Sequence, residues 1–253
     1  MAPIKAIGFD LFNTLIMAEP WGINEALARL TASLADNGIA LEQEAFKQAY
    51  RDAAVRFIRE AGLDGRETHN RFWISAALEK FGYHVLPDDP RIAATVEAYF
   101  STFYDFCYRV PGTRSMLERL KDEVQLGLLS NFTHWPAALE IINRLGLAPF
   151  FEVKLISGQL GYRKPHRKVF RELTDGFDAS IDEIMYVGDD VDADVNGALA
   201  AGIQPVWFTY VQDKKPPIPA HMAPSETDDP HESVPRVSTW TEFLSLLKEG
   251  VVI

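Results

Sequence analysis

The stretch IKAIGFDLFNTL, residues 4–15, decides the fold of this chain of 253 residues. Residues 4–9 form a short and mostly apolar segment, which is typical of a strand buried on both faces of a parallel sheet. Asp10 follows directly, at the carboxyl end of the predicted strand. Because open α/β sheets bind their ligands at that end, we expect Asp10 to lie in a functional site.

The second half of the chain repeats this pattern. Four more apolar segments, each separated from the next by a predicted helix, are expected to be strands: residues 124–129, 153–156, 184–187 and 203–208. Such alternation predicts a parallel sheet covered by helices on both faces, so the fold class is α/β with a doubly wound, Rossmann-like core. Residues 212–235 are rich in proline and predict a surface loop, and a strand-to-helix element is expected over residues 236–250.

Between the first strand and that region lies a long segment with a helical pattern only. Apolar residues recur at intervals of three and four in four successive parts of residues 18–108. The pattern predicts four amphipathic helices, with Cys107 as a small buried hydrophobe at the end of the fourth. We expect a core domain of residues 1–17 and 109–253 and an inserted helical subdomain of residues 18–108.

Composition narrows the classes of protein and of partner. The formal net charge of −11 argues against a nucleic-acid partner, because phosphate contacts need a clustered excess of Lys and Arg. No apolar run approaches the ~18 residues that a membrane span requires, so no membrane partner is expected. The single cysteine excludes a disulfide framework and fits a cytoplasmic location. A small molecule is the expected partner, and the oligomeric state stays open.

Polar residues stand where the predicted strands end or in the loop that follows: Asp10, Ser130, Asn131, Lys164, Asp189 and Asp190. Because the carboxyl ends of parallel strands share one edge of the sheet, we expect these side chains to converge. Carboxylates that lie so close raise one another's pKa unless a cation lies among them, and oxygen ligands favour Mg²⁺. Lys164 adds a positive charge that can hold an anionic group. Asp10 could then act as a nucleophile toward a phosphoryl group.

At these positions the sequence resembles the haloacid dehalogenase-like hydrolase superfamily. Four motifs match in the family's order: FDLFNTL at residues 9–15, LLSN at 128–131, KP at 164–165, and GDDVDAD at 188–194. The helical stretch between the first two motifs matches the cap that family members insert there. The resemblance, which extends to about residue 210, implies a doubly wound α/β core with an inserted four-helix cap and an active site between the two.

The resemblance also implies a metal site. Asp189, the carboxylate of Asp10 and the backbone carbonyl of Phe12 would bind Mg²⁺. Asp190 and Asp194 would act through metal-bound water or by orienting the motif's lysine. These five residues are therefore the candidate metal ligands.

The same resemblance implies roles in catalysis for five residues. Asp10 would be the nucleophile that forms an aspartyl intermediate, and Lys164 would hold the transferred group beside the metal. Thr14, Ser130 and Asn131 would position the anion and the nucleophile. The implied activity is Mg²⁺-dependent hydrolysis of a small phosphorylated metabolite.

One position departs from the phosphatase pattern. Family phosphatases usually carry a second aspartate two residues after the nucleophile, where this chain has Phe12; the family's dehalogenases carry an aromatic residue there. The acidic fourth motif points the other way, because the dehalogenases replace its acidic pair with neutral residues and need no metal. We therefore favour a phosphatase biased to good leaving groups, or one whose acid comes from elsewhere, such as His134. The alternatives are a metal-free 2-haloacid dehalogenase with the same nucleophile and a non-catalytic binder of phosphorylated ligands.

Overall fold

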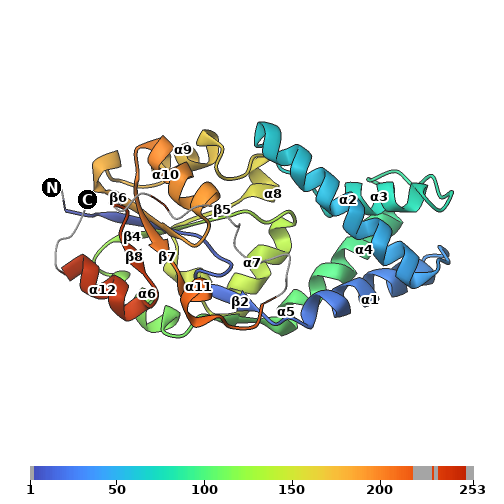
Figure 1. Cartoon of the computed structure of the whole chain (residues 1–253), viewed down its shortest axis with the longest axis horizontal. Helices are drawn as coiled ribbons and strands as arrows, with labels where there is room; N and C mark the ends of the chain where they lie inside the picture. Colours follow the sequence, from blue (N-terminus) through green and yellow to red (C-terminus); the bar gives the residue numbers. More distant parts are fainter. Residues whose placement is uncertain (1–2, 219–229, 231–232, 249–253) are drawn as a thin grey trace.

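A six-stranded parallel sheet forms the centre of the core (Figure 1). The computed structural model describes residues 3–218, 230 and 233–248. The strand order is β5-β4-β1-β6-β7-β8, so the chain turns to one side of β1 and later crosses to the other. The strands are β1 (Ala6–Phe9), β4 (Gln125–Ser130), β5 (Val153–Ile156), β6 (Ile184–Gly188), β7 (Gln204–Phe208) and β8 (Arg236–Val237).

Helices cover both faces of this sheet, which confirms the predicted doubly wound α/β fold (Figure 1). Successive residues of one strand enter opposite cores: Leu129 packs with Phe170 and Leu173, whereas Leu128 packs with Ile141 and Phe243. Strands buried on both sides need apolar residues at every position, which explains their continuous hydrophobic pattern. The first face carries α9 (Arg167–Asp175) and α10 (Gly197–Ala201), and the second carries α6 (Thr113–Leu120), α7 (Trp135–Arg144) and α12 (Trp240–Lys248).

The segment between residues 18 and 107 is mainly helical and lies beyond the carboxyl edge of the sheet, at the right of Figure 1. The four expected helices are present, and a fifth of four residues follows them. The helices are α1 (Gly22–Asp36), α2 (Gln43–Asp64), α3 (Asn70–Glu79), α4 (Pro90–Ser101) and α5 (Phe103–Phe106).

Two short strands join this helical segment to the core. β2 (Ile16–Ala18) and β3 (Cys107–Arg109) pair antiparallel, so the chain leaves and re-enters the core side by side. The prediction that the helical pattern runs through Tyr108 and that Cys107 ends a helix is therefore wrong. Cys107 starts a strand, although it is a buried free cysteine as expected. Three-residue strands that pair across about ninety residues of chain leave no periodic signal in the sequence.

The predicted proline-rich loop begins later than expected. Helix α11 (Tyr210–Lys214) takes up its first three positions, because the chain continues helically after β7. Residues 219–229 and 231–232 of that loop lie outside the described residues. The helix predicted between β6 and β7 begins as a wide turn over Val191–Asn196 that leads into α10. The remaining elements are α8 (Ser157–Leu160) and the 3₁₀ turns Ala148–Phe150 and Ile181–Glu183.

Candidate active site

Three buried carboxylates meet at the carboxyl edge of the sheet. Asp10 follows β1, Asp189 follows β6, and Asp194 lies in the wide turn after β6. One oxygen from each lies within 4.8 Å of the others. The pairing of β1 with both β4 and β6 puts Asp10 at the middle of this edge. The sheet topology thus produces the convergence that the strand ends predicted.

Lys164 lies among these carboxylates and is almost fully buried. Its Nζ donates to Asp10 Oδ1 and to Asp194 Oδ1, each at 2.6 Å, and to the hydroxyl of Tyr186 at 2.9 Å. Burial opposes a charge on the amine, but the carboxylates of Asp10 and Asp194 outweigh it and hold the pKa of Lys164 well above its usual value. The amine is therefore a fixed positive charge beside the candidate nucleophile.

One ammonium does not balance three carboxylates, which leaves a formal charge of −2 in the cluster. Burial, together with the charges of Asp10 and Asp194, raises the pKa of Asp189 well above its usual value. Burial also raises the pKa of Asp194, although Lys164 acts against this rise. A divalent cation would restore the balance, and an all-oxygen donor set is what Mg²⁺ prefers. The residues present therefore fit the metal that the sequence predicted.

The loop after Asp10 supports Asp189. The hydroxyl of Thr14, which is fully buried, donates to Asp189 Oδ1 at 3.4 Å. Asn13 adopts a left-handed backbone conformation at φ 61°, and a hydrogen bond from its side chain lowers the pKa of Asp189. The first motif thus contributes both the candidate nucleophile and two groups that hold the carboxylate of Asp189 in place.

Asn131 fixes the backbone of the loop that carries Lys164. Its Nδ2 donates to the carbonyl of Lys164 at 3.0 Å, and its Oδ1 accepts from the amide of Lys164 at 2.8 Å. Ser130 is buried at the end of β4, directly before it. The paired hydrogen bonds assign Asn131 a positioning contact, and the anion-binding roles of Ser130 and Asn131 stay predictions.

Asp190 differs from the other acids of the fourth motif. It is not among the three grouped carboxylates. Its Oδ1 accepts from the amide of Ala193 at 2.7 Å, which caps the wide turn, and its own amide donates to Asp194 Oδ2 at 3.0 Å. Asp190 thus shapes the turn that brings Asp194 inward, and its role as a metal ligand stays a prediction.

Tyr186 is a site residue that the sequence did not indicate. Its hydroxyl accepts from Lys164 and donates to the carbonyl of Leu129 at 2.9 Å. A tyrosine in an otherwise aliphatic strand was the available signal, because a buried hydroxyl needs a partner. Tyr186 connects β6 to β4 beneath the cluster and fixes the direction of the lysine.

Phe12 and His134 both face aromatic residues. The ring of Phe12 stacks on Phe132 at a centroid distance of 5.3 Å, and Phe103 stands edge-on to it at 6.5 Å. His134 stacks on Phe100, and its Nδ1 lies 3.2 Å from Nε2 of His69. Burial lowers the pKa of His134, although Glu97, whose Oε1 lies 3.1 Å from Nε2 of the ring, acts in the opposite direction. These contacts give no support to His134 as the acid that Phe12 does not supply.

Comparison with known proteins shows to which protein family this chain belongs. The model of the haloacid dehalogenase-like hydrolase family matches residues 4–202, so the chain belongs to this family of hydrolases. It is 32% identical over 218 residues to a protein of Pyrococcus abyssi named glyceraldehyde 3-phosphate phosphatase, a match that covers 82% of each chain. It is 28% identical to a protein of Halopiger xanaduensis named ribulose-1,5-bisphosphate 5-phosphatase, over 92% of this chain and 91% of that one.

Solved structures share the fold over nearly the whole chain. A 2-haloacid dehalogenase from Pseudomonas syringae superposes with a TM-score of 0.71 at 23% identity and covers 98% of this chain and all of its own. A putative hydrolase of the family from Bacillus subtilis, solved with magnesium, superposes with a TM-score of 0.61 at 20% identity over 97% of this chain and 99% of its own. At these identities the likeness is one of fold. Among the described residues, no helix is long and apolar enough to cross a membrane.

Proposed function

We propose that the protein is a Mg²⁺-dependent phosphohydrolase that acts on a small phosphorylated metabolite through an aspartyl-phosphate at Asp10. The observation that carries the proposal is the grouping of three buried carboxylates around one ammonium. The phosphatase names of the relatives from Pyrococcus abyssi and Halopiger xanaduensis support it. A cytoplasmic site of action fits the single, free cysteine.

The reaction would proceed in two displacements. An oxygen of Asp10 attacks phosphorus, the bond to the leaving oxygen breaks, and the leaving group takes away the electron pair of that bond. Water then attacks the phosphorus of the aspartyl-phosphate and releases inorganic phosphate, which regenerates the carboxylate. Lys164 stabilises the charge on the transferred group, because its ammonium stays protonated beside Asp10. Asp10, Asp189 and Asp194 would hold Mg²⁺, which supplies further positive charge when it is bound.

We propose further that residues 18–108 act as a cap over the carboxyl edge of the sheet. The adjacent strands β2 and β3 would be the hinge, because they are the covalent links between the two parts. A loop of the helical segment also contacts the core directly. The amide of Glu67 donates to the carbonyl of Gly161 at 3.0 Å, and the amide of Arg163 donates to the carbonyl of Gly65 at 2.9 Å. Closure of such a cap would exclude water from the site.

The first test is release of nitrophenol from para-nitrophenyl phosphate, with Mg²⁺ and with EDTA, by the native protein and by Asp10→Asn. We expect turnover that requires both Mg²⁺ and Asp10, because this leaving group needs almost no proton. Halide release from a 2-haloacid in EDTA, with no phosphate release, would support the metal-free dehalogenase instead. Mg²⁺-dependent ligand binding without any product would support the non-catalytic binder.

Phe12, at the position where family phosphatases usually carry an aspartate, predicts a bias toward good leaving groups. A positioned general acid contributes about 10²–10⁴ in rate, so alkyl phosphates should be poor substrates of the native protein. Phe12→Asp should raise turnover of an alkyl phosphate much more than turnover of para-nitrophenyl phosphate. Comparable turnover of alkyl and aryl phosphates by the native protein would contradict the bias.

A further inference from the structure

A cavity of about 420 Å³ lies between the helical segment and the core. Its volume falls in the range of small-molecule sites, which is about 300–1,000 Å³. Asn131 belongs to its wall and bonds the backbone of Lys164, so the cavity adjoins the site where phosphate would be transferred. A substrate whose phosphate group lies at the cluster would place the rest of its structure in this cavity.

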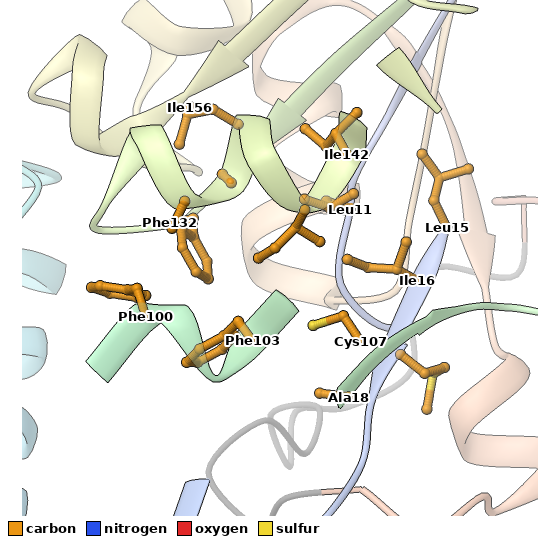
Figure 2. Close-up of a cluster of buried hydrophobic side chains, with 14 of the residues drawn as sticks. Leu11, Leu15, Ile16, Ala18, Phe100, Phe103, Cys107, Phe132, Ile142 and Ile156 are labelled. Carbon is orange, nitrogen blue, oxygen red and sulfur yellow. The ribbon is translucent and has the colours of Figure 1, made fainter. Parts of the chain in front are cut away.

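Apolar side chains form most of the cavity wall. Figure 2 shows Phe100, Phe103 and Phe132 gathered between α7 and the α4–α5 segment. Phe12 stacks on Phe132 at the side of the first motif. Leu27, Val55 and Ile58 continue the apolar wall along α1 and α2. The aromatic ring that occupies the position of the usual acid is thus packed into the same aromatic group that lines the cavity.

The buried and partly buried polar side chains of the wall already have hydrogen-bond or ion-pair partners. Asn70 donates to the hydroxyl of Tyr50 and accepts from Thr133, each at 2.5 Å. Glu67 accepts a hydrogen bond from Ser157 and lies 3.4 Å from Arg163.

Arg51 also belongs to the wall but is exposed, and its charge acts on Glu44 and Tyr99. Few donors and acceptors are therefore free to meet the hydroxyl groups of a sugar or triose. Each hydroxyl buried without a partner weakens binding by about tenfold or more.

We infer that the substrate of this enzyme is the phosphate ester of an apolar, ring-bearing group, an aryl phosphate, rather than a polyol phosphate. The inference rests on the proposed function and deepens it. Two separate observations favour the same class. Phe12 cannot protonate a leaving group, and a phenol, with a pKa near that of tyrosine at about 10, leaves far more readily than an alcohol. The cavity wall favours a ring and offers few partners to a polyol.

The test compares rates of phosphate release at saturating Mg²⁺. Cyclohexyl phosphate and glycerol 3-phosphate are both alkyl esters, so their comparison isolates the cavity from the leaving group. We expect kcat/KM for cyclohexyl phosphate to exceed that for glycerol 3-phosphate by about tenfold or more. We expect 2-naphthyl phosphate to exceed phenyl phosphate several-fold, because the larger ring buries more apolar surface. Glycerol 3-phosphate turned over as well as cyclohexyl phosphate would overturn the inference and leave the proposed function intact.

Two variants on one helix link the preference to the cavity wall. Ile58 lines the cavity, whereas Leu63, also on α2, is 85% exposed and does not. Ile58→Asn should lower kcat/KM for 2-naphthyl phosphate by about 3- to 10-fold and leave glycerol 3-phosphate within a factor of two. Leu63→Asn should change neither. Equal losses for both esters, or equal effects of both variants, would contradict a cavity that selects apolar rings.

A binding measurement separates this inference from the proposed function. Asp10→Asn removes the nucleophile, so titration calorimetry of that variant reports binding alone. We expect 2-naphthyl phosphate to bind at least about tenfold more tightly than glycerol 3-phosphate, with the negative heat-capacity change of apolar burial. If the native protein hydrolyses no ester but this binding preference is observed, the proposed hydrolase function is refuted and the inferred ligand class is supported. No preference in binding would refute the ligand class.

Discussion

Replacing Lys164 with methionine should destabilise the fold strongly, although methionine fills a similar space. The side chain of Lys164 is 2% exposed, and its Nζ lies 2.6 Å from both Asp10 and Asp194. At an effective dielectric constant of about 20, each contact corresponds to 332/(20 × 2.6), or about 6 kcal/mol of attraction. The cost of burying the amine offsets much of this. Loss of one partner of a buried ion pair costs about 3–5 kcal/mol, which is the loss of unfolding free energy that we expect for Lys164→Met.

The assay is urea unfolding at pH 8 in EDTA, with Asp194→Asn and the Lys164→Met/Asp194→Asn double variant as the matched set. The double variant should recover at least half of the loss, because it removes a carboxylate that the single variant leaves without a counter-charge. At pH 6 the loss should be smaller, since Asp194 without its lysine takes up a proton and becomes neutral. Mg²⁺ should stabilise Lys164→Met more than the native protein, because the cluster then carries one more uncompensated negative charge.

Two results would refute this reasoning. A single variant within about 1 kcal/mol of the native protein would mean that the carboxylates near Lys164 are already neutral or hydrated. A double variant no more stable than the single variant would mean that the loss comes from packing rather than from charge.

Three further predictions concern neighbouring features. Gly188→Ala should cost about 1–3 kcal/mol and lower turnover, because an added Cβ would lie 2.3 Å from Asp194 Oδ2; an unchanged urea midpoint would contradict this. Gly62→Ala, whose Cβ meets nothing within 4 Å in α2, should stabilise by about 0.5–1 kcal/mol in the same assay, and a loss would contradict it. Burial lowers the pKa of His69 from 6.5 to about 4, so stability should fall as pH drops from about 6.5 to 4, where only the unfolded state binds the proton. His69→Gln should reduce this slope, and equal slopes would assign the pH response to other groups.

The sequence predicts the sheet and its functional edge well because both depend on local patterns. A strand buried on both faces must be apolar throughout, and a polar residue directly after it stands at the ligand-binding edge. Asp10 and Asp189 are therefore predictable from this pattern, whereas Lys164 lies in a loop and its role comes from the family resemblance; the structure brings all three together. Strands β2 and β3 cannot be predicted in this way, because β2 pairs only with β3, about ninety residues away.

The fourth motif shows where local pattern stops being sufficient. Asp190 and Asp194 are equivalent in a sequence that contains several acids within seven positions. Their separation depends on the wide turn after β6: Asp190 caps that turn, and its amide directs the carboxylate of Asp194 inward. Position 188 must be glycine for Asp194 to fit, because a Cβ there would overlap the carboxylate of Asp194. Which acid enters the site is thus decided by backbone geometry that residue types do not specify.

Phe12 connects the chemistry of the site to its specificity. Residue type alone shows that the position lacks an acid, and the leaving-group bias follows from that absence. Residue type does not show that the ring stacks on Phe132, because the partner lies about 120 residues away and belongs to the loop after β4. Through its contacts with Phe132 and Phe103, the ring of Phe12 packs against two aromatic side chains that line the cavity. An acid at this position would place a charged group against Phe103 and Phe132, which carries a desolvation cost. The residue that cannot protonate a leaving group thus also packs against two side chains of the apolar wall, so we expect the leaving-group preference and the ligand preference to change together.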